Sequence, residues 1–213
     1  LILAERARRR GIDAEVVHVG LPEEIPDSLD VYTLGGGEDT AQALAADKFR
    51  GTSGLARALD AGRPLLAICA SLQVLGHWYE DARGARVPGM GVLDITTLPQ
   101  GHRAIGELVT VPLVEGLTQA LSGFENHGGG TVLGPDAAPL GRVVSGVGNG
   151  TPQGRQPADV AYDGAVQGSI IATYMHGPAL ARNPELADLL LQRATGMSLP
   201  PLEVPCVAQL SAE

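Results

Sequence analysis

The sequence contains few aromatic residues, only two cysteines and no long apolar run. Phe, Trp and Tyr make up 3% of the 213 residues, so a core has to be built mainly from Leu, Val, Ile and Ala. No apolar stretch approaches the roughly 20 residues of a membrane-spanning helix, and no charged-then-apolar signal pattern is found. A single disulfide bond between Cys69 and Cys206 would be an unusual way to stabilise a chain of this length. We therefore expect free thiols, a cytoplasmic location and no membrane insertion.

The sequence also lacks an excess of basic residues. It has 24 Asp and Glu against 15 Lys and Arg, for a formal net charge of −9. This balance argues against nucleic acid and anionic membranes as partners, because both bind basic surfaces. Hydrophobic residues account for 44% and charged residues for 18%, an ordinary globular composition. We expect one domain over residues 1–213.

The first half of the chain alternates between helical and strand patterns. Helices are predicted over residues 1–10, 40–60 with a break near Gly51, and 71–79; strands are predicted over 14–17, 31–34 and 64–68. Apolar strands separated by helices are typical of βαβ units. The predicted fold class is α/β, with a mostly parallel sheet flanked by helices in three layers.

The second half has a different pattern, with short β-type runs separated by Gly and Pro. These runs cover residues 108–111, 131–133, 141–144 and 169–172, and a final helix is predicted over 183–194, with Pro184 in its first turn. Residues 146–163 are rich in Gly, Pro and Gln and are predicted to form a loop. We interpret this half as an antiparallel extension of the sheet.

The start of the chain is unusual because Leu1 opens directly into a helical pattern. No capping residue and no strand precede that helix. This pattern predicts a lead-in segment upstream of Leu1.

The strongest local signal for chemistry is Cys69, which follows an apolar strand and precedes a helix. Small neighbours such as Ala70 and Ser71 suit a sharp strand-to-helix turn, which would expose the side chain at the carboxyl end of the strand. Backbone N–H groups at the helix start could lower the thiol pKa and bind an oxyanion. The alternative is a buried cysteine at the end of a core strand.

A cysteine nucleophile needs a base, and the sequence offers five histidines: His18, His77, His102, His127 and His176. His18 would end an early strand, and His77 would lie on the helix after the turn. His176 stands at the end of a strand that Gly177-Pro178 terminates, where a base could reach Cys69. A structural hydrogen-bonding role for His176 fits the residues about equally well.

A second oxyanion donor could come from the triplet Gly35-Gly36-Gly37, which follows a strand and precedes a helix. Its backbone N–H groups can face the same crevice as Cys69. Glycine triplets also occur in ordinary turns. The Lys-Ser/Thr ending of a phosphate-binding loop is missing, so nucleotide binding is not predicted.

Several segments together resemble the class I glutamine amidotransferases, in the branch shared with the cobyric acid synthases. The resemblance covers residues 1–195 and narrows to GatD-type glutaminase subunits, which assist a Mur-ligase-like (MurT-type) synthetase in amidating the glutamate of lipid II. It rests on LGGGED (34–39), LAICASLQVLG (66–76), RAIGE (103–107), GFENHGG (123–129), GVGNG (146–150) and TYMHGPALARNPELAD (173–188).

The resemblance implies roles for individual residues. Cys69 matches the nucleophile, His176 the base, and Arg103 an arginine that recognises L-glutamine, whose α-carboxylate suits a guanidinium. The oxyanion would be bound by the backbone of Gly36 and Ala70. The block with Glu125, Asn126 and His127 is typical of the family, but its members receive no individual role. No cofactor or metal is implied, and ATP would bind to the partner.

The sequence departs from the family pattern at three places. Ser71 replaces a usual glycine, and Pro178 stands where most class I members carry a triad glutamate, as in the cobyric acid branch. The family's first strand and its Asp-containing loop, a possible source of a third catalytic group, have no counterpart. Three alternatives therefore stay open: a cobyric-acid-type glutaminase, a non-catalytic binding subunit, or a cysteine peptidase of related fold.

Overall fold

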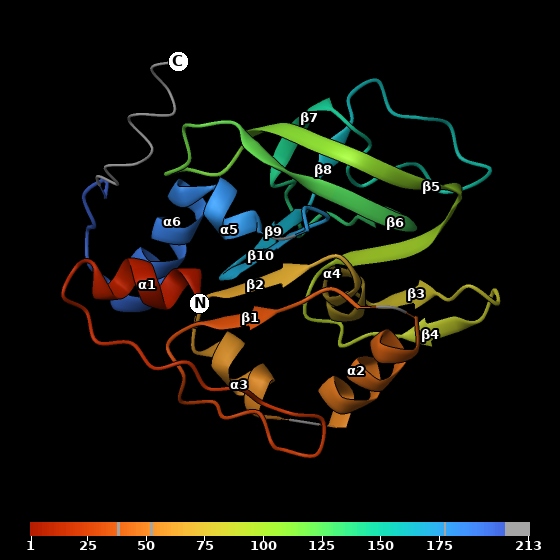
Figure 1. Cartoon of the computed structure of the whole chain (residues 1–213). Coiled ribbons are helices and arrows are strands. Elements are labelled where there is room, and N and C mark those ends of the chain that lie inside the picture. Colours follow the sequence, from red (N-terminus) through yellow and green to blue (C-terminus); the bar gives the residue numbers. More distant parts are fainter. Residues whose placement is uncertain (38, 52, 177, 203–213) are drawn as a thin grey trace.

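The computed structural model of the chain describes residues 1–37, 39–51, 53–176 and 178–202. Helices flank two separate sheets (Figure 1). The helices are α1 Ile2–Arg8, α2 Asp39–Gly51, α3 Gly54–Asp60, α4 Ala70–Leu75, α5 Ala179–Arg182 and α6 Pro184–Thr195. None of the helices within the described ranges is long and apolar enough to span a bilayer. The predicted α/β class is confirmed.

The first sheet has the order β1-β2-β10-β9, formed by β1 Tyr32–Leu34, β2 Leu65–Ile68, β10 Ile170–Thr173 and β9 Ala165–Gln167. β1, β2 and β10 are parallel, and β9 is antiparallel to β10. β2 is apolar throughout and largely buried, as expected of a strand covered on both faces. Ile68 pairs with Thr173, so the carboxyl ends of β2 and β10 lie side by side.

The second sheet is larger and mostly antiparallel. Its order is β4-β3-β5-β7-β8, with β6 also paired to β5; the strands are β3 Trp78–Glu80, β4 Arg86–Pro88, β5 Ile95–Pro112, β6 Leu121–Leu133, β7 Gly141–Ser145 and β8 Tyr162–Asp163. The predicted runs 108–111 and 131–133 are the ends of β5 and β6. We refer to this pair of strands as the long hairpin, which crosses above the parallel strands in Figure 1.

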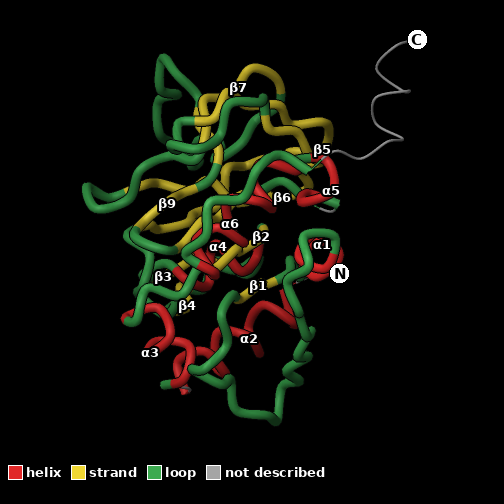
Figure 2. The backbone as a smooth tube through the Cα atoms, turned by 90° about the vertical axis from the view of Figure 1, so that its left-hand side faces the viewer, coloured by secondary structure: helices red, strands yellow, loops and turns green. Residues whose placement is uncertain are grey.

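The N-terminal helix is attached to the C-terminal one by buried charges. Asp188 on α6 accepts hydrogen bonds from the guanidinium groups of Arg6, at 2.7 and 2.6 Å, and of Arg10, at 2.8 Å. Figure 2, turned by 90°, shows helices on either side of the strands. Two segments distant in sequence are thereby held at one side of the parallel sheet.

Four predictions differ from the structure. The run over residues 169–172, assigned to the antiparallel half, is β10 of the parallel sheet, and the predicted loop over 146–163 ends in the short strand β8. Residues 14–17 form no strand; Val16 and Val17 are 44% and 46% exposed and line a cavity of about 1550 Å³ together with α1 and β1. A short run of strand-forming residues such as Val16 and Val17 does not form a strand when no neighbouring strand accepts its backbone hydrogen bonds.

The helix predicted over residues 71–79 ends at Leu75. Gly76 lies so close to β5 that an added Cβ would be 2.7 Å from Ile95 Cγ1, and the His77 N–H donates to the Ile95 carbonyl. The chain therefore turns into β3 instead of continuing as a helix.

Candidate active site

Cys69 occupies a strained turn between β2 and α4. Its backbone angles are φ 52° and ψ −107°, and among the described residues no other non-glycine residue has positive φ. The Cys69 N–H donates to the Thr173 carbonyl at 2.8 Å, which ties the turn to the end of β10. The expected sharp turn is therefore present. Its conformation is costly for a residue with a side chain, and the hydrogen bond to β10 helps to hold it.

Gly36 and His176 lie against Cys69. A Cβ added to Gly36 would be 3.5 Å from Cys69 Cβ, and 3.1 Å and 3.5 Å from Cε1 and Nδ1 of His176. The glycine loop, the cysteine and the histidine therefore meet at the carboxyl ends of β1, β2 and β10. A side chain at position 36 would fill the space between the thiol and the imidazole.

The His176 ring is half-buried and sits between the two sheets. The backbone N–H of His176 donates to the Phe124 carbonyl at 2.8 Å, which joins the chain after β10 to β6. Burial lowers the pKa of His176, and the nearby charges of His127 and Arg103 lower it further. Nε2 is buried, and no hydrogen-bond partner for it is found among the described residues. A neutral imidazole, which can accept a proton, is thus favoured.

The Cys69 thiol is 6% exposed, and burial raises its pKa to about 11. The Ala70 N–H and the positive charge of Arg103 act in the opposite direction, but burial outweighs them. The start of the following helix thus lowers this pKa, as expected, but desolvation of the thiolate dominates, so the pKa is raised overall. At neutral pH the resting group is a thiol that requires a base.

Ser71 lies in the first turn of α4, at the position where the resemblance led us to expect glycine. Its side chain is buried, and its Oγ donates a hydrogen bond to the carbonyl oxygen of Gly35 at 2.5 Å. The departure from the family pattern thus links the cysteine turn to the glycine loop.

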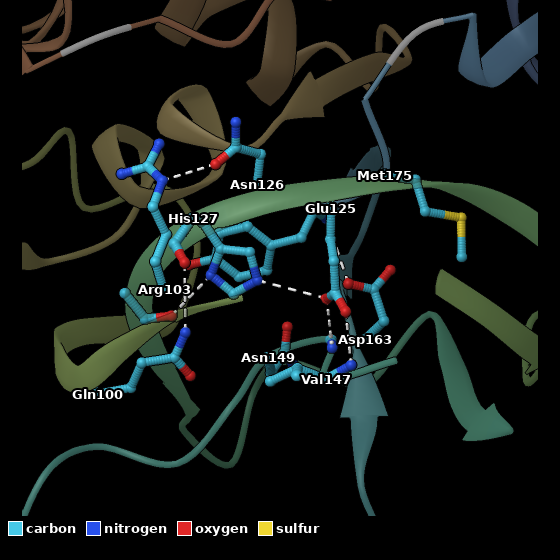
Figure 3. Close-up of polar contacts among 12 residues, drawn as sticks. Gln100, Arg103, Glu125, Asn126, His127, Val147, Asn149, Asp163 and Met175 are labelled. Carbon is cyan, nitrogen blue, oxygen red and sulfur yellow. Dashed lines mark hydrogen bonds and ion pairs between the residues drawn. The ribbon is translucent and has the colours of Figure 1, made fainter. Parts of the chain in front are cut away.

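Arg103 belongs to the long hairpin and lies close enough to act electrostatically on Cys69 and His176. It sits where the β5–β6 register shifts between Pro99 and Ala104. Its Nε donates to Oδ1 of Asn126 at 2.6 Å, as Figure 3 shows. This bond fixes one edge of the guanidinium and leaves the two terminal nitrogens available for an anion.

Glu125 and His127 point to the other side of β6 from Asn126 and are buried. The Glu125 carboxylate accepts the N–H groups of Val147 and Gly148 at 2.7 and 2.8 Å and lies 3.5 Å from His127 Nε2 (Figure 3). It thereby anchors the beginning of the segment predicted as a loop. No individual roles for these residues follow from the sequence alone, and only the alternation of β6, in which consecutive side chains face opposite sides, separates them.

A cluster of buried polar side chains lies next to the Cys69 turn. The His127 ring stacks on Tyr174 with centroids 3.7 Å apart, and the Tyr174 hydroxyl is bonded to Thr131 at 2.7 Å and to Gln73 at 3.0 Å. Gln73 is the glutamine of the motif that carries Cys69. These contacts join α4, β6 and the end of β10.

Asp163 is fully buried beneath the end of β10. Its carboxylate accepts the Thr173 hydroxyl at 2.5 Å and the Tyr174 N–H at 3.2 Å. Burial raises the pKa of Asp163 to about 6, although both hydrogen bonds oppose that shift. The sequence analysis did not select this residue, because a single aspartate at the end of a loop carries no distinguishing pattern.

The remaining candidates lie apart from this site or outside the described residues. His77 follows α4 and is bonded to Asp94 at 2.8 Å, and His18 lies in an irregular segment; neither occupies the predicted element. Cys206 falls outside the described residues. Within the described ranges, no group of three or more His, Cys, Asp and Glu side chains is arranged to hold a metal ion.

Comparison with known families identifies residues 3–184 with the CobB/CobQ-like glutamine amidotransferase domain. The chain is 34% identical to the lipid II isoglutaminyl synthase subunit GatD of Staphylococcus aureus, covering 100% of this chain and 85% of the relative. The corresponding subunit of Streptococcus pneumoniae is 33% identical, with 91% and 72% covered. A cobyric acid synthase of Jannaschia sp. is 32% identical, but only 33% of its length is matched.

Solved structures agree on the fold. A glutamine amidotransferase crystal structure superposes with a TM-score of 0.56 at 21% identity, covering 91% of this chain and 93% of that chain. The structure of PurLQS from Thermotoga maritima gives a TM-score of 0.57 at 18% identity, with 92% and 91% covered. At these identities the likeness concerns the fold alone.

Proposed function

The chain belongs to the CobB/CobQ-like glutamine amidotransferase family, and on that premise we propose that it hydrolyses L-glutamine to glutamate and ammonia for a Mur-ligase-like partner. The ammonia would serve to amidate the glutamate of lipid II in peptidoglycan synthesis. The observation that carries the proposal is the meeting of Cys69, His176 and Gly36 at the ends of three parallel strands. The GatD relatives, matched over most of their length, support the choice of substrate and partner.

Glutamine would bind between the two sheets, with its α-carboxylate on the free nitrogens of Arg103. A guanidinium edge forms two parallel hydrogen bonds to a carboxylate, which fixes orientation as well as charge. The charge of Arg103 also acts on Cys69, which supports a pose in which the same substrate presents its side-chain amide to the thiol.

The first half-reaction forms a thioester. Sγ of Cys69 bonds to the side-chain amide carbon as neutral His176 accepts the thiol proton, and the carbonyl oxygen becomes an oxyanion. The N–H groups of Gly36 and Ala70 are the proposed donors to that oxygen. The carbon–nitrogen bond then breaks, and the leaving nitrogen takes the proton from His176 to depart as ammonia.

The second half-reaction restores the enzyme. His176 accepts a proton from water, whose oxygen bonds to the thioester carbon. The carbon–sulfur bond then breaks, Cys69 recovers its proton from the imidazolium, and glutamate leaves. The high thiol pKa supports this order, in which proton transfer accompanies attack instead of preceding it.

The full-length protein and a Cys69→Ser variant would be assayed for ammonia release from glutamine, with and without the co-purified synthetase. We expect release that depends on Cys69 and increases with the partner. A Cys69→Ser protein as active as the parent would remove the thioester mechanism. If the parent releases no ammonia in either sample, the chain is a binding subunit.

A further inference from the structure

The Ser71 hydrogen bond acts on the peptide that is proposed to bind the oxyanion. Oγ of Ser71 donates to the carbonyl oxygen of Gly35 at 2.5 Å. That carbonyl and the N–H of Gly36 belong to one peptide group. Ser71 is therefore bonded to the same rigid unit that carries a proposed oxyanion donor.

A trans peptide is planar, and its C=O and N–H point in opposite directions. Holding the Gly35 carbonyl toward Ser71 thus directs the Gly36 N–H away from α4. Ser71 is 7% exposed, whereas Gly36 is exposed, so the carbonyl points into the protein and the N–H toward the open side of the loop. Among the described residues, no acceptor is bonded to the Gly36 N–H.

A glycine-rich loop needs such a restraint. Gly35, Gly36 and Gly37 have no side chains that would oppose rotation of the peptide, and an added Cβ on Gly35 would meet nothing within 4 Å. β1 ends at Leu34, and within the described part of the chain no strand pairs with residues 35–37. The hydroxyl of Ser71 supplies a restraint from the opposite side of the cysteine turn.

We propose that Ser71 is a positioning residue that holds the Gly35–Gly36 peptide with its N–H directed at the substrate, so that the oxyanion site is formed before glutamine binds. This inference rests on the proposed glutaminase function. It also gives the Ser71 hydroxyl a role, because it restrains a peptide that the neighbouring glycines leave free to rotate.

The test compares Ser71→Ala with the parent in the intact complex. Loss of the Ser71 hydroxyl leaves the Gly36 N–H present but no longer oriented, so kcat for glutamine hydrolysis should fall roughly five- to tenfold. This loss is smaller than the roughly 10²–10³-fold decrease that follows when an oxyanion donor is removed altogether. KM should stay within about twofold of the parent, because ground-state binding does not use the oxyanion site. Alkylation of Cys69 by iodoacetamide forms no oxyanion, so its rate should not change.

A Thr195→Val variant is the matched control, because Thr195 Oγ1 donates to the Leu191 carbonyl at 2.8 Å in α6, away from the site. It should lose a comparable hydrogen bond without any change in kcat. The inference is overturned if Ser71→Ala keeps the parental kcat, or if its alkylation rate falls in parallel with kcat. Ser71→Gly, judged by the same readings, replaces Ser71→Ala if the latter does not fold.

Cys69→Ser, measured alongside, separates the two levels of the proposal. Activity that survives Cys69→Ser overturns the glutaminase mechanism itself, and with it the role of Ser71. Activity that requires Cys69 but is indifferent to Ser71→Ala overturns only the positioning role.

Discussion

The parallel sheet and the long hairpin contribute different kinds of residue to the site. β2 and β10 are four residues long, buried, and lead directly to Cys69 and His176. β5 and β6 are 18 and 13 residues long, and part of one face is open, with Ile105 63% and Phe124 40% exposed. The hairpin carries Arg103 and Asn126. Groups proposed to form bonds thus come from the buried sheet, and groups proposed to recognise substrate come from the partly exposed one.

This division indicates how each region can vary. Strand ends buried on both faces fix the distance between a nucleophile and its base, and proton transfer between the two groups requires a fixed distance. An exposed hairpin face can change its side chains at little cost in stability, as substrate recognition requires. Substitutions in the parallel sheet should therefore change kcat, and substitutions in the hairpin should change KM.

The largest effect is expected at His176. His176→Ala removes the proposed base for a thiol whose pKa is about 11, so kcat should fall roughly 10²- to 10⁴-fold while KM changes little. Steady-state kinetics of ammonia release measure both quantities. A variant whose defect appears mainly in KM would contradict the division between the sheets.

The second prediction concerns the state of the resting thiol. Because burial raises the pKa of Cys69 to about 11, iodoacetamide alkylation should accelerate about tenfold per pH unit from pH 7 to 10. The thiolate fraction rises with pH until the thiol pKa is reached. Rates that level off near neutrality would instead indicate a preformed thiolate–imidazolium pair. His77→Ala is a control, since His77 lies away from the thiol.

Arg103→Ala tests the hairpin directly. Loss of a charge-assisted pair with the substrate carboxylate costs roughly 1.5–3 kcal/mol, so KM for glutamine should rise about ten- to a hundredfold. Arg182→Ala removes another arginine, bonded to Glu107 of β5 at 2.7 Å, and serves as the control. An Arg103→Ala enzyme with unchanged KM would exclude Arg103 from glutamine recognition.

The smallest effect is expected at Asn126, which contacts Arg103 and has no proposed contact with substrate. Asn126→Ala leaves the guanidinium charged but free to rotate, so KM should rise about fivefold, the value of one ordinary hydrogen bond. Asn126→Asp retains the acceptor oxygen and should recover most of the affinity. If Asp does no better than Ala, the Asn126–Arg103 bond does not position the guanidinium.

The sequence predicted the parallel region more closely than the antiparallel one. The runs ending at Leu34 and Ile68 are short, apolar and bounded by turn residues, which is typical of a buried strand. The run over residues 169–172 was recognised as a strand but assigned to the antiparallel half, whereas β10 is parallel to β2. The strand–Cys–helix pattern around Cys69 also identified a turn that the structure contains. These elements depend on local sequence, because each strand is bounded by its own turn residues.

The hairpin depends on pairing between distant residues, which local patterns do not contain. Residues 108–111 and 131–133 were recognised only as separate short runs, although they belong to strands that pair along most of their length. The same reason explains why Asn126 and Glu125 received no roles: their partners, Arg103 and residues 147–148, are 22 or more positions away. The sequence indicates the effect of the Ala70 N–H on the thiol pKa but not the larger effect of burial, because burial cannot be read from one turn.

The positive φ of Cys69 places the nucleophile in a conformation that favours glycine. At φ 52° and ψ −107° a glycine would be relaxed, whereas a cysteine carries strain on the order of 1–3 kcal/mol. Glycine at this position would relieve that strain but would also remove a side chain buried in the core. The strain is kept because the proposed turnover requires a thiol at the point where the chain turns most sharply.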